Sequence, residues 1–201
     1  MASKQAPTAA LALAVGLALC GGPLAYAQAQ PATANPATLA ACAACHGPGG
    51  QSSNPTVPSL AAQPRTFLEN QLVLIREGLR DVPVMKGVMA GVDDNEITVL
   101  ARYFAAQPAQ PLPGAVQPEK ARAGAELSRR ALCGGCHLPG YVGQNQVPRL
   151  AGQPEAYLLA TMKMYRDKPE PGRDTLMSGP LAGMKDTELD SLAHYLAHHG
   201  K

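Results

Sequence analysis

The sequence is constrained most by the five-residue pattern C-x-x-C-H, which occurs twice, at residues 42–46 and 133–137. This is the attachment pattern of a c-type haem. Two thiols at this spacing can each add to one vinyl group of a porphyrin, and the adjacent histidine then offers a ring nitrogen to the iron. The alternative is a pair of zinc or redox dithiols with chance histidines, but two complete copies within 201 residues favour two covalently bound haem c groups. The residues predicted to hold them are Cys42, Cys45 and His46 for the first haem, and Cys133, Cys136 and His137 for the second.

The composition agrees with buried cofactors. The chain contains no tryptophan and only two phenylalanines, Phe67 and Phe104, so little aromatic bulk is available to fill the cores of two small domains. A porphyrin in each core would supply the missing apolar volume. The formal net charge of +2 provides no basic field for nucleic acid, so nucleic-acid binding is excluded.

Residues 1–27 have the pattern of a cleavable signal peptide. Lys4 gives a positive start, residues 9–20 are apolar, and the Ala-Tyr-Ala at 25–27 fits a cleavage site. After cleavage every remaining cysteine lies in a haem motif, which suits a bacterial periplasm, where c-type haem is attached. The alternative is an uncleaved membrane anchor, although the apolar run is short for a spanning helix.

The sequence also contains an internal repeat. Leu-Ala-Ala-Gln-Pro at 60–64 recurs as Leu-Ala-Gly-Gln-Pro at 150–154, and the apolar pattern that starts at Ile97 recurs without gaps from Leu189. Helical spacing of apolar residues predicts a helix over residues 65–79 and another that is capped by Asp93 or Asp94. The predicted fold class is therefore all-α, with two similar tandem domains that each enclose one haem.

A proline-rich segment separates the two copies. Prolines at 108, 111 and 113 make it unsuitable for a helix, so it is predicted to be a semi-stiff extended linker. The expected organisation is a signal peptide at 1–27, a first domain at 28–107, a linker at 108–117 and a second domain at 118–201. Residues 28–38 are expected to be a frayed start of the mature chain.

The repeat also selects candidates for the second axial ligand of each iron, for which electron-transfer haems commonly use methionine. Counting back from the final helix, Met85 aligns with Met177, whereas Met89 aligns with Leu181. Met85 and Met177 also fall in loops that contain glycine and proline, 39 and 40 residues after their histidines. They are the predicted ligands of the first and second iron, and the other methionines are expected to fill space around the porphyrin.

Two prolines are candidates for orienting the histidine ligands. Pro58 and Pro148 follow their histidines by 12 and 11 residues. A ligand histidine usually donates its outer ring N–H to a fixed acceptor, and either proline carbonyl could serve. Spacing alone leaves open whether these are ordinary loop prolines.

Three further histidines lie near the end of the chain, at His194, His198 and His199. They could bind a metal or replace a haem ligand. The expectation is instead that they are solvated and interact favourably with the helix dipole when charged.

Taken together, these motifs resemble cytochrome c4, a family of di-haem periplasmic cytochromes. The resemblance rests on CAACHGPGG, the LAAQP and LAGQP pair, the methionine loops, and the ARYFAAQP and AHYLAHHG segments. It implies two class I cytochrome c domains, His/Met ligation of both haems, and proline carbonyls that accept from the ligand histidines. Gly124 matches the glycine of the family's opening helix, whereas residues 31–41 contain no glycine.

The function expected from the resemblance is that of a periplasmic electron carrier between a quinol-linked donor complex and a terminal oxidase. Such a protein is not an enzyme and takes no small-molecule substrate, and the prediction leaves room for loose membrane association. The alternative is the cytochrome subunit of a periplasmic dehydrogenase, for example one acting on sulfide or an alcohol. A di-haem peroxidase is a third hypothesis, but the matching methionine in both halves argues against the vacant iron position that it requires.

Overall fold

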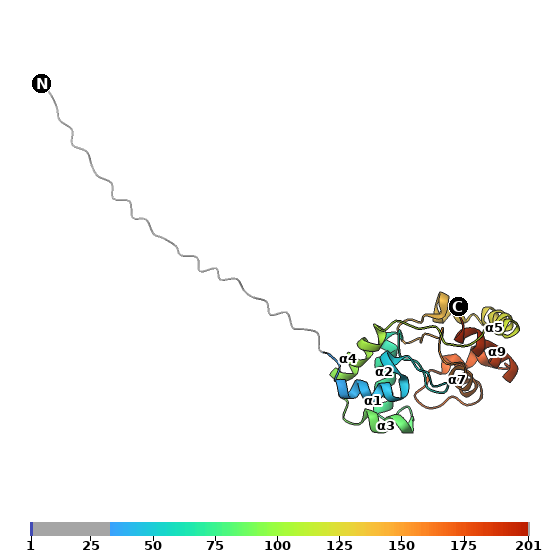
Figure 1. Ribbon diagram of the computed structural model, residues 1–201, viewed down its shortest axis with the longest axis horizontal. Helices are drawn as coiled ribbons and strands as arrows, with labels where there is room; N and C mark the ends of the chain where they lie inside the picture. Colours follow the sequence, from blue (N-terminus) through green and yellow to red (C-terminus); the bar gives the residue numbers. More distant parts are fainter. Residues whose placement is uncertain (2–32, 201) are drawn as a thin grey trace. The chain divides into compact units, whose positions relative to one another are not determined.

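The computed structural model describes Met1 and residues 33–200, and within this part the chain forms helices and short 3-10 turns with no β-strand. The predicted signal peptide lies outside the described residues, apart from Met1. In Figure 1, α1 to α4 lie together, and α5, α7 and α9 lie together. The first half contains α1 Pro36–His46, η1 Pro48–Gly50, α2 Arg65–Arg76, α3 Pro83–Met89 and α4 Asp94–Ala105. The second half contains α5 Pro118–Arg130, α6 Cys133–His137, η2 Pro139–Tyr141, α7 Glu155–Asp167, η3 Thr175–Met177, α8 Ser178–Leu181 and α9 Asp186–Ala197.

The core of the first half forms where α2 packs against α4. The apolar face predicted for the first of these helices is buried, and α4 starts at an Asp93 cap whose carboxylate accepts from the Glu96 N–H at 2.8 Å. Helical periodicity therefore produces two amphipathic helices whose apolar stripes meet. The buried apolar residues of this core are Leu68, Leu72, Ile75, Met89, Val92, Ile97, Leu100, Ala101 and Phe104.

The core of the second half is built on α9, which packs against both α5 and α7. At the crossing with α5, Gly124 lets the two backbones approach closely: a Cβ at this position would lie 2.2 Å from the Ser191 carbonyl oxygen. No larger residue fits at this point without moving one of the helices. The buried apolar residues of this core are Leu158, Met162, Leu181, Leu189, Leu192, Ala193, Leu196 and Ala197.

An arginine at the end of the long helix holds the methionine loop of each half in the same way. In the first half, Arg76 donates to the Val92 carbonyl oxygen at 3.1 Å, and in the second Arg166 donates to the Met184 carbonyl oxygen at 2.8 Å. Each arginine also forms an ion pair with the aspartate two residues after that carbonyl. The shared contacts fix both ends of the two loops in the register that the repeat alignment assigned.

Some local expectations were wrong in detail. The helix that carries the first haem motif begins at Pro36, within the segment expected to be frayed, because Asn35 caps it by accepting from the Ala37 N–H at 2.9 Å. The loop around Pro83 contains the short helix α3, and α2 ends at Arg76 rather than at Leu79. Residues 108–117 form no helix or strand, and α5 begins at Pro118, where the fixed φ of proline suits the first turn of a helix.

Hydrogen bonds of backbone and polar side-chain groups join the two halves. The Tyr157 N–H donates to the Pro55 carbonyl oxygen at 3.0 Å, and the buried Arg149 guanidinium donates to the Ala61 carbonyl oxygen at 2.9 Å. Gln63 and Gln153 add further buried hydrogen bonds across the same boundary. In the part of the chain that the structure describes, no helix has both the length and the apolar character needed to span a membrane.

Candidate haem sites

The first candidate site lies at the end of α1. His46 is buried, and its Nδ1 donates to the Pro58 carbonyl oxygen at 2.8 Å. Burial lowers the pKa of His46, while the bond to Pro58 opposes this shift by favouring the protonated ring. In the neutral ring the proton stays on Nδ1, so Nε2 keeps a free lone pair that can bind a metal.

The second candidate site has the same arrangement at the end of α6. The Nδ1 atom of His137 donates to the Pro148 carbonyl oxygen at 2.7 Å. Burial is also the main cause that lowers the pKa of His137. Its Nε2 is buried and has no hydrogen-bond partner among the described residues, which is the state expected of a nitrogen that binds a metal when the cofactor is present.

The cysteines of both motifs are free thiols held on helices. Cys42 and Cys133 are half-buried, whereas Cys45 and Cys136 are exposed. Residues three apart in a helix lie on the same side, so both thiols of a motif face the same region of space. Burial raises the pKa of the Cys42 thiol.

The chain must turn sharply after the first motif so that the proline carbonyl can reach the histidine. Gly47 makes this turn with φ of +76°, and its N–H donates back to the Ala43 carbonyl oxygen at 2.9 Å. A Cβ at this position would lie 2.0 Å from the Gln51 carbonyl oxygen, so glycine is required on both conformational and steric grounds.

The candidate methionines occupy equivalent places in the two halves. Met85 in α3 and Met177 in η3 are half-buried at the edges of their cores. Met89 and Leu181, which the repeat aligns with each other, are almost completely buried at 2% and 1% exposure. These two side chains are therefore committed to core packing, and Met85 and Met177 remain the predicted iron ligands.

Arg149 supplies independent evidence for an acidic cofactor beside the boundary between the two halves, where its guanidinium donates to the Ala61 and Ala151 carbonyl oxygens. Its side chain is 4% exposed, it pairs with no carboxylate among the described residues, and its Nε lacks a hydrogen-bond partner there. Burial lowers the pKa of Arg149 to about 10. A buried cation is costly without a counter-charge, and a haem propionate would provide one. The residues present therefore fit a haem.

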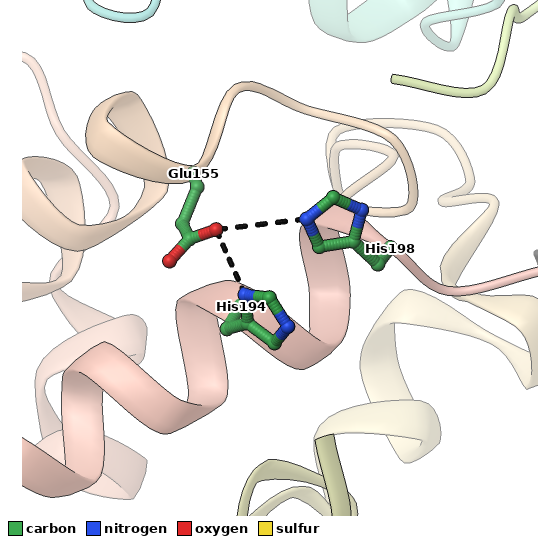
Figure 2. Close-up of side chains that lie close together, drawn as sticks. All are labelled: Glu155, His194 and His198. Carbon is green, nitrogen blue, oxygen red and sulfur yellow. Dashed lines mark hydrogen bonds and ion pairs between the residues drawn. The ribbon is translucent and has the colours of Figure 1, made fainter. Parts of the chain in front are cut away.

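The environment of the C-terminal histidines differs from the solvated one that was expected. His194 is 1% exposed, so the expectation of a solvated ring was wrong for this residue. Figure 2 shows His194 on α9 and His198 directly after the end of this helix, both beside the Glu155 carboxylate. The His194 Nδ1 lies 2.9 Å and the His198 Nε2 lies 3.7 Å from Glu155 Oε2.

The hydrogen bonds of His194 show what this cluster does. Its Nε2 accepts from the Gln117 N–H at 2.9 Å, so the ring proton is on Nδ1 and is donated to Glu155. Neither nitrogen of His194 is open to a metal ion or a haem iron. The cluster instead ties α7 and α9 to the residue that precedes α5.

Sequence reasoning did not identify Arg149, Gln63 or Gln153 as residues of the site. The two glutamines lie in the repeated Leu-Ala-Ala-Gln-Pro and Leu-Ala-Gly-Gln-Pro segments, which align the halves and contribute to the family resemblance but assign the glutamines no role. The recurrence of an amide at the same place, next to apolar residues in a loop, was the available signal. The role of this amide depends on a contact with the other half, and the sequence alone does not show how the two halves are arranged.

Comparison with known proteins agrees with the geometry. Residues 121–200 match the family model described as cytochrome c. Cytochrome c4 of Azotobacter vinelandii is 30% identical over 188 residues, which cover 84% of this chain and 89% of the relative. A thiosulfate dehydrogenase electron acceptor of Thiomonas intermedia is 34% identical, with coverage of 88% of this chain and 86% of the relative.

Among solved structures, reduced recombinant cytochrome c4 of Pseudomonas stutzeri superimposes with a TM-score of 0.74 at 29% identity, covering 81% of this chain and 95% of the other. The predicted all-α fold of two tandem class I cytochrome c domains is thus confirmed. Because the sequence similarity extends over most of both chains, this protein belongs to the cytochrome c4 family of electron-transfer cytochromes.

Proposed function

We propose that this chain is a periplasmic di-haem electron carrier, which accepts electrons from a quinol-linked donor complex and passes them to a terminal oxidase. The observation that carries the proposal is the repeated geometry at His46 and His137. In each half a histidine directly follows a pair of free cysteines and donates its Nδ1 proton to a proline carbonyl oxygen. This leaves one ring nitrogen for an iron in each half, and therefore two haem c groups in the chain.

The assignment of the site residues follows the repeat. Each cysteine pair would hold a porphyrin through thioethers, and the histidine and the methionine of the same half would ligate its iron. The proposed set is Cys42, Cys45, His46 and Met85 for the first haem, with Pro58 as the acceptor of the histidine proton, and Cys133, Cys136, His137 and Met177 for the second, with Pro148 as the acceptor. The proposed domains are residues 28–107 and 118–201, joined by the linker at 108–117.

When bound, each haem supplies an iron that exchanges one electron between its ferric and ferrous states. The residues of the chain orient the iron ligands and retain the cofactor. The proline carbonyls hold the histidine rings in one tautomer and one orientation, which reduces the structural change that accompanies electron transfer. The cysteines, which are free here, would anchor the cofactor through thioethers, so that it could not leave during short encounters with redox partners, whose interfaces are typically small.

The location and the carrier role can be tested on one preparation. The expressed protein should be recovered from the periplasmic fraction without residues 1–27, and a haem assay should give two covalent haems per chain, both low-spin in the ferric form. The isolated protein should be reduced by a quinol-linked donor complex and reoxidised by membranes that contain a terminal oxidase. Fewer than two covalent haems, or failure of the intact di-haem protein in both reactions, would contradict the proposal.

A second candidate function is that of the electron acceptor in a periplasmic dehydrogenase system. The similarity to the Thiomonas intermedia relative named for thiosulfate dehydrogenase favours thiosulfate oxidation over the sulfide and alcohol oxidations considered from the sequence. The two candidates are separated by comparing initial rates of reduction of the same preparation by a quinol-linked complex and by a thiosulfate dehydrogenase with its substrate. Faster reduction by the dehydrogenase at equal partner concentration would support the second candidate.

A further inference from the structure

Two glutamine side chains clasp the backbone of the opposite half. In the first half, the Gln63 Oε1 accepts from the Arg149 N–H at 2.9 Å, and its Nε2 donates to the Arg149 carbonyl oxygen at 3.0 Å. In the second half, the Gln153 Oε1 accepts from the Ser59 N–H at 2.9 Å, and its Nε2 donates to the Ser59 carbonyl oxygen at 2.7 Å. Both glutamines are buried, at 4% and 2% exposure, so these bonds are shielded from water.

Gln153 is hydrogen-bonded to a peptide group that is also part of the first haem site. The Ser59 N–H belongs to the same peptide group as the Pro58 carbonyl, since the two residues are consecutive. That carbonyl accepts the His46 Nδ1 proton at 2.8 Å. One peptide group therefore receives a hydrogen bond from the candidate iron ligand and donates one to the other half of the molecule.

The clasp of Gln63 repeats this arrangement at the second haem site. The Arg149 N–H belongs to the same peptide group as the Pro148 carbonyl, which accepts the His137 Nδ1 proton at 2.7 Å. In both cases the glutamine of one half bonds to the peptide group beside the histidine of the other half, an arrangement called crosswise below. Gln153 acts on the peptide group next to His46, and Gln63 acts on the peptide group next to His137.

Hydrogen bonds in such a chain polarise one another. When a peptide N–H donates to an acceptor in a poorly hydrated interior, its carbonyl becomes a stronger acceptor. A stronger acceptor draws the Nδ1 proton of the histidine, which makes the imidazole a more electron-rich ligand. Electron-rich ligation stabilises ferric over ferrous iron and lowers the reduction potential.

We propose that Gln153 lowers the reduction potential of the haem bound by the first half, and that Gln63 lowers the potential of the haem bound by the second. The glutamines are positioning residues that act through the Pro58 and Pro148 carbonyls. This inference rests on the proposed assignment of His46 and His137 as iron ligands. Its distinctive content is that each half tunes the other's haem.

The test uses the full-length holoprotein with the substitutions Gln63→Met and Gln153→Met, which keep most of the side-chain volume and remove both hydrogen-bonding atoms. Gln51→Met is a matched control. Gln51 makes the same two-point contact with a backbone, because its Oε1 accepts from the Gln110 N–H at 3.1 Å and its Nε2 donates to the Gln110 carbonyl oxygen at 3.4 Å. The Gln51 Nε2 also donates to the Ser59 Oγ at 3.5 Å, but Gln51 bonds to neither of the peptide groups next to the histidines.

Each haem is followed separately in a redox titration by its assigned haem-methyl NMR signals. Cooperative strengthening is about 10–30% of one hydrogen bond, so Gln153→Met should raise the ferrous-to-ferric ratio of the first haem about twofold at fixed ambient potential. This ratio corresponds to roughly 18 mV at 59 mV per tenfold change for one electron. Gln63→Met should change the second haem by a similar factor, and Gln51→Met should change neither.

Three results would overturn the inference: a shift of the haem in the same half as the substitution, equal shifts of both haems, or no shift in a variant that retains two haems. If a methionine variant does not fold, Gln153→Asn and Gln63→Asn keep a buried amide but fall one methylene short of the peptide N–H, and they should produce the same crosswise shifts. A haem assay on the wild-type protein separates this outcome from failure of the proposed function. Without two covalent haems the function itself is refuted, whereas unshifted potentials in intact di-haem variants refute only the crosswise tuning.

Discussion

Replacing Gly124 with alanine tests whether the second half depends on the close crossing of α5 and α9. The added Cβ would lie 2.2 Å from the Ser191 carbonyl oxygen and 2.5 Å from the Tyr195 Cβ. Relief of these contacts requires the helices to separate by about 1 Å, since a carbon and an oxygen rest near the same distance as the 3.5 Å optimum for carbon pairs. Overpacking of this kind costs up to about 3 kcal/mol. Alanine favours the helix by about 1 kcal/mol relative to glycine, which offsets part of this cost. The free energy of unfolding should therefore fall by about 2 kcal/mol.

The assay is thermal unfolding of the holoprotein, followed by far-ultraviolet circular dichroism and by the haem absorption band. For a domain pair of this size, about 2 kcal/mol corresponds to a fall in Tm of roughly 4–8 °C. Gly134→Ala is the matched control, because a Cβ there meets no atom within 4 Å and the first motif has alanine at the equivalent position 43. An unchanged or raised Tm for Gly124→Ala would refute the close-packed crossing.

Met85→Ala and Met177→Ala should each remove about half of the weak long-wavelength absorption of ferric Met–haem bonds and lower one reduction potential, because a soft, neutral thioether favours ferrous iron. Met89→Ala should leave this absorption unchanged, and its loss there would show that the first loop is shifted by one turn. Cys133→Ser should remove one of the two thioethers proposed for the second haem and lower the helicity of the second half, and undiminished helicity would contradict haem-dependent folding. A protease site inserted in the linker at 108–117 should give two mono-haem fragments that still co-elute after cleavage, because buried hydrogen bonds join the halves; separate elution would show that these bonds are too weak to hold them.

Much of the fold was predictable because the signals are local. The apolar spacing of the segment 65–76 predicts its helix, and Asp93 predicts the start of the helix that follows. The short helix at 83–89 was not predicted, because proline and glycine within it obscure the periodicity, and the arginine contact that holds this loop is not local. The expectation for His194 was wrong for a similar reason. Its burial depends on Glu155, 39 residues away along the chain, and on Gln117.

The contact between the halves shows how a repeated motif can serve two purposes. Each copy contains a peptide N–H that needs an acceptor and, a few residues later, a glutamine that can provide one. The peptide N–H and the glutamine of the same half do not bond to each other. The Ser59 N–H, for example, donates to Gln153 of the other half rather than to Gln63 of its own. Two similar copies can satisfy each other reciprocally, as the subunits of an isologous dimer do. A half on its own would leave its glutamine and this peptide group for water to satisfy or, where they stay buried, unpaired at a cost of about 1–3 kcal/mol per group. The same bonds end on the peptide groups that orient His46 and His137, so the contact that stabilises the pair of domains is also the one through which each domain can influence the other's haem.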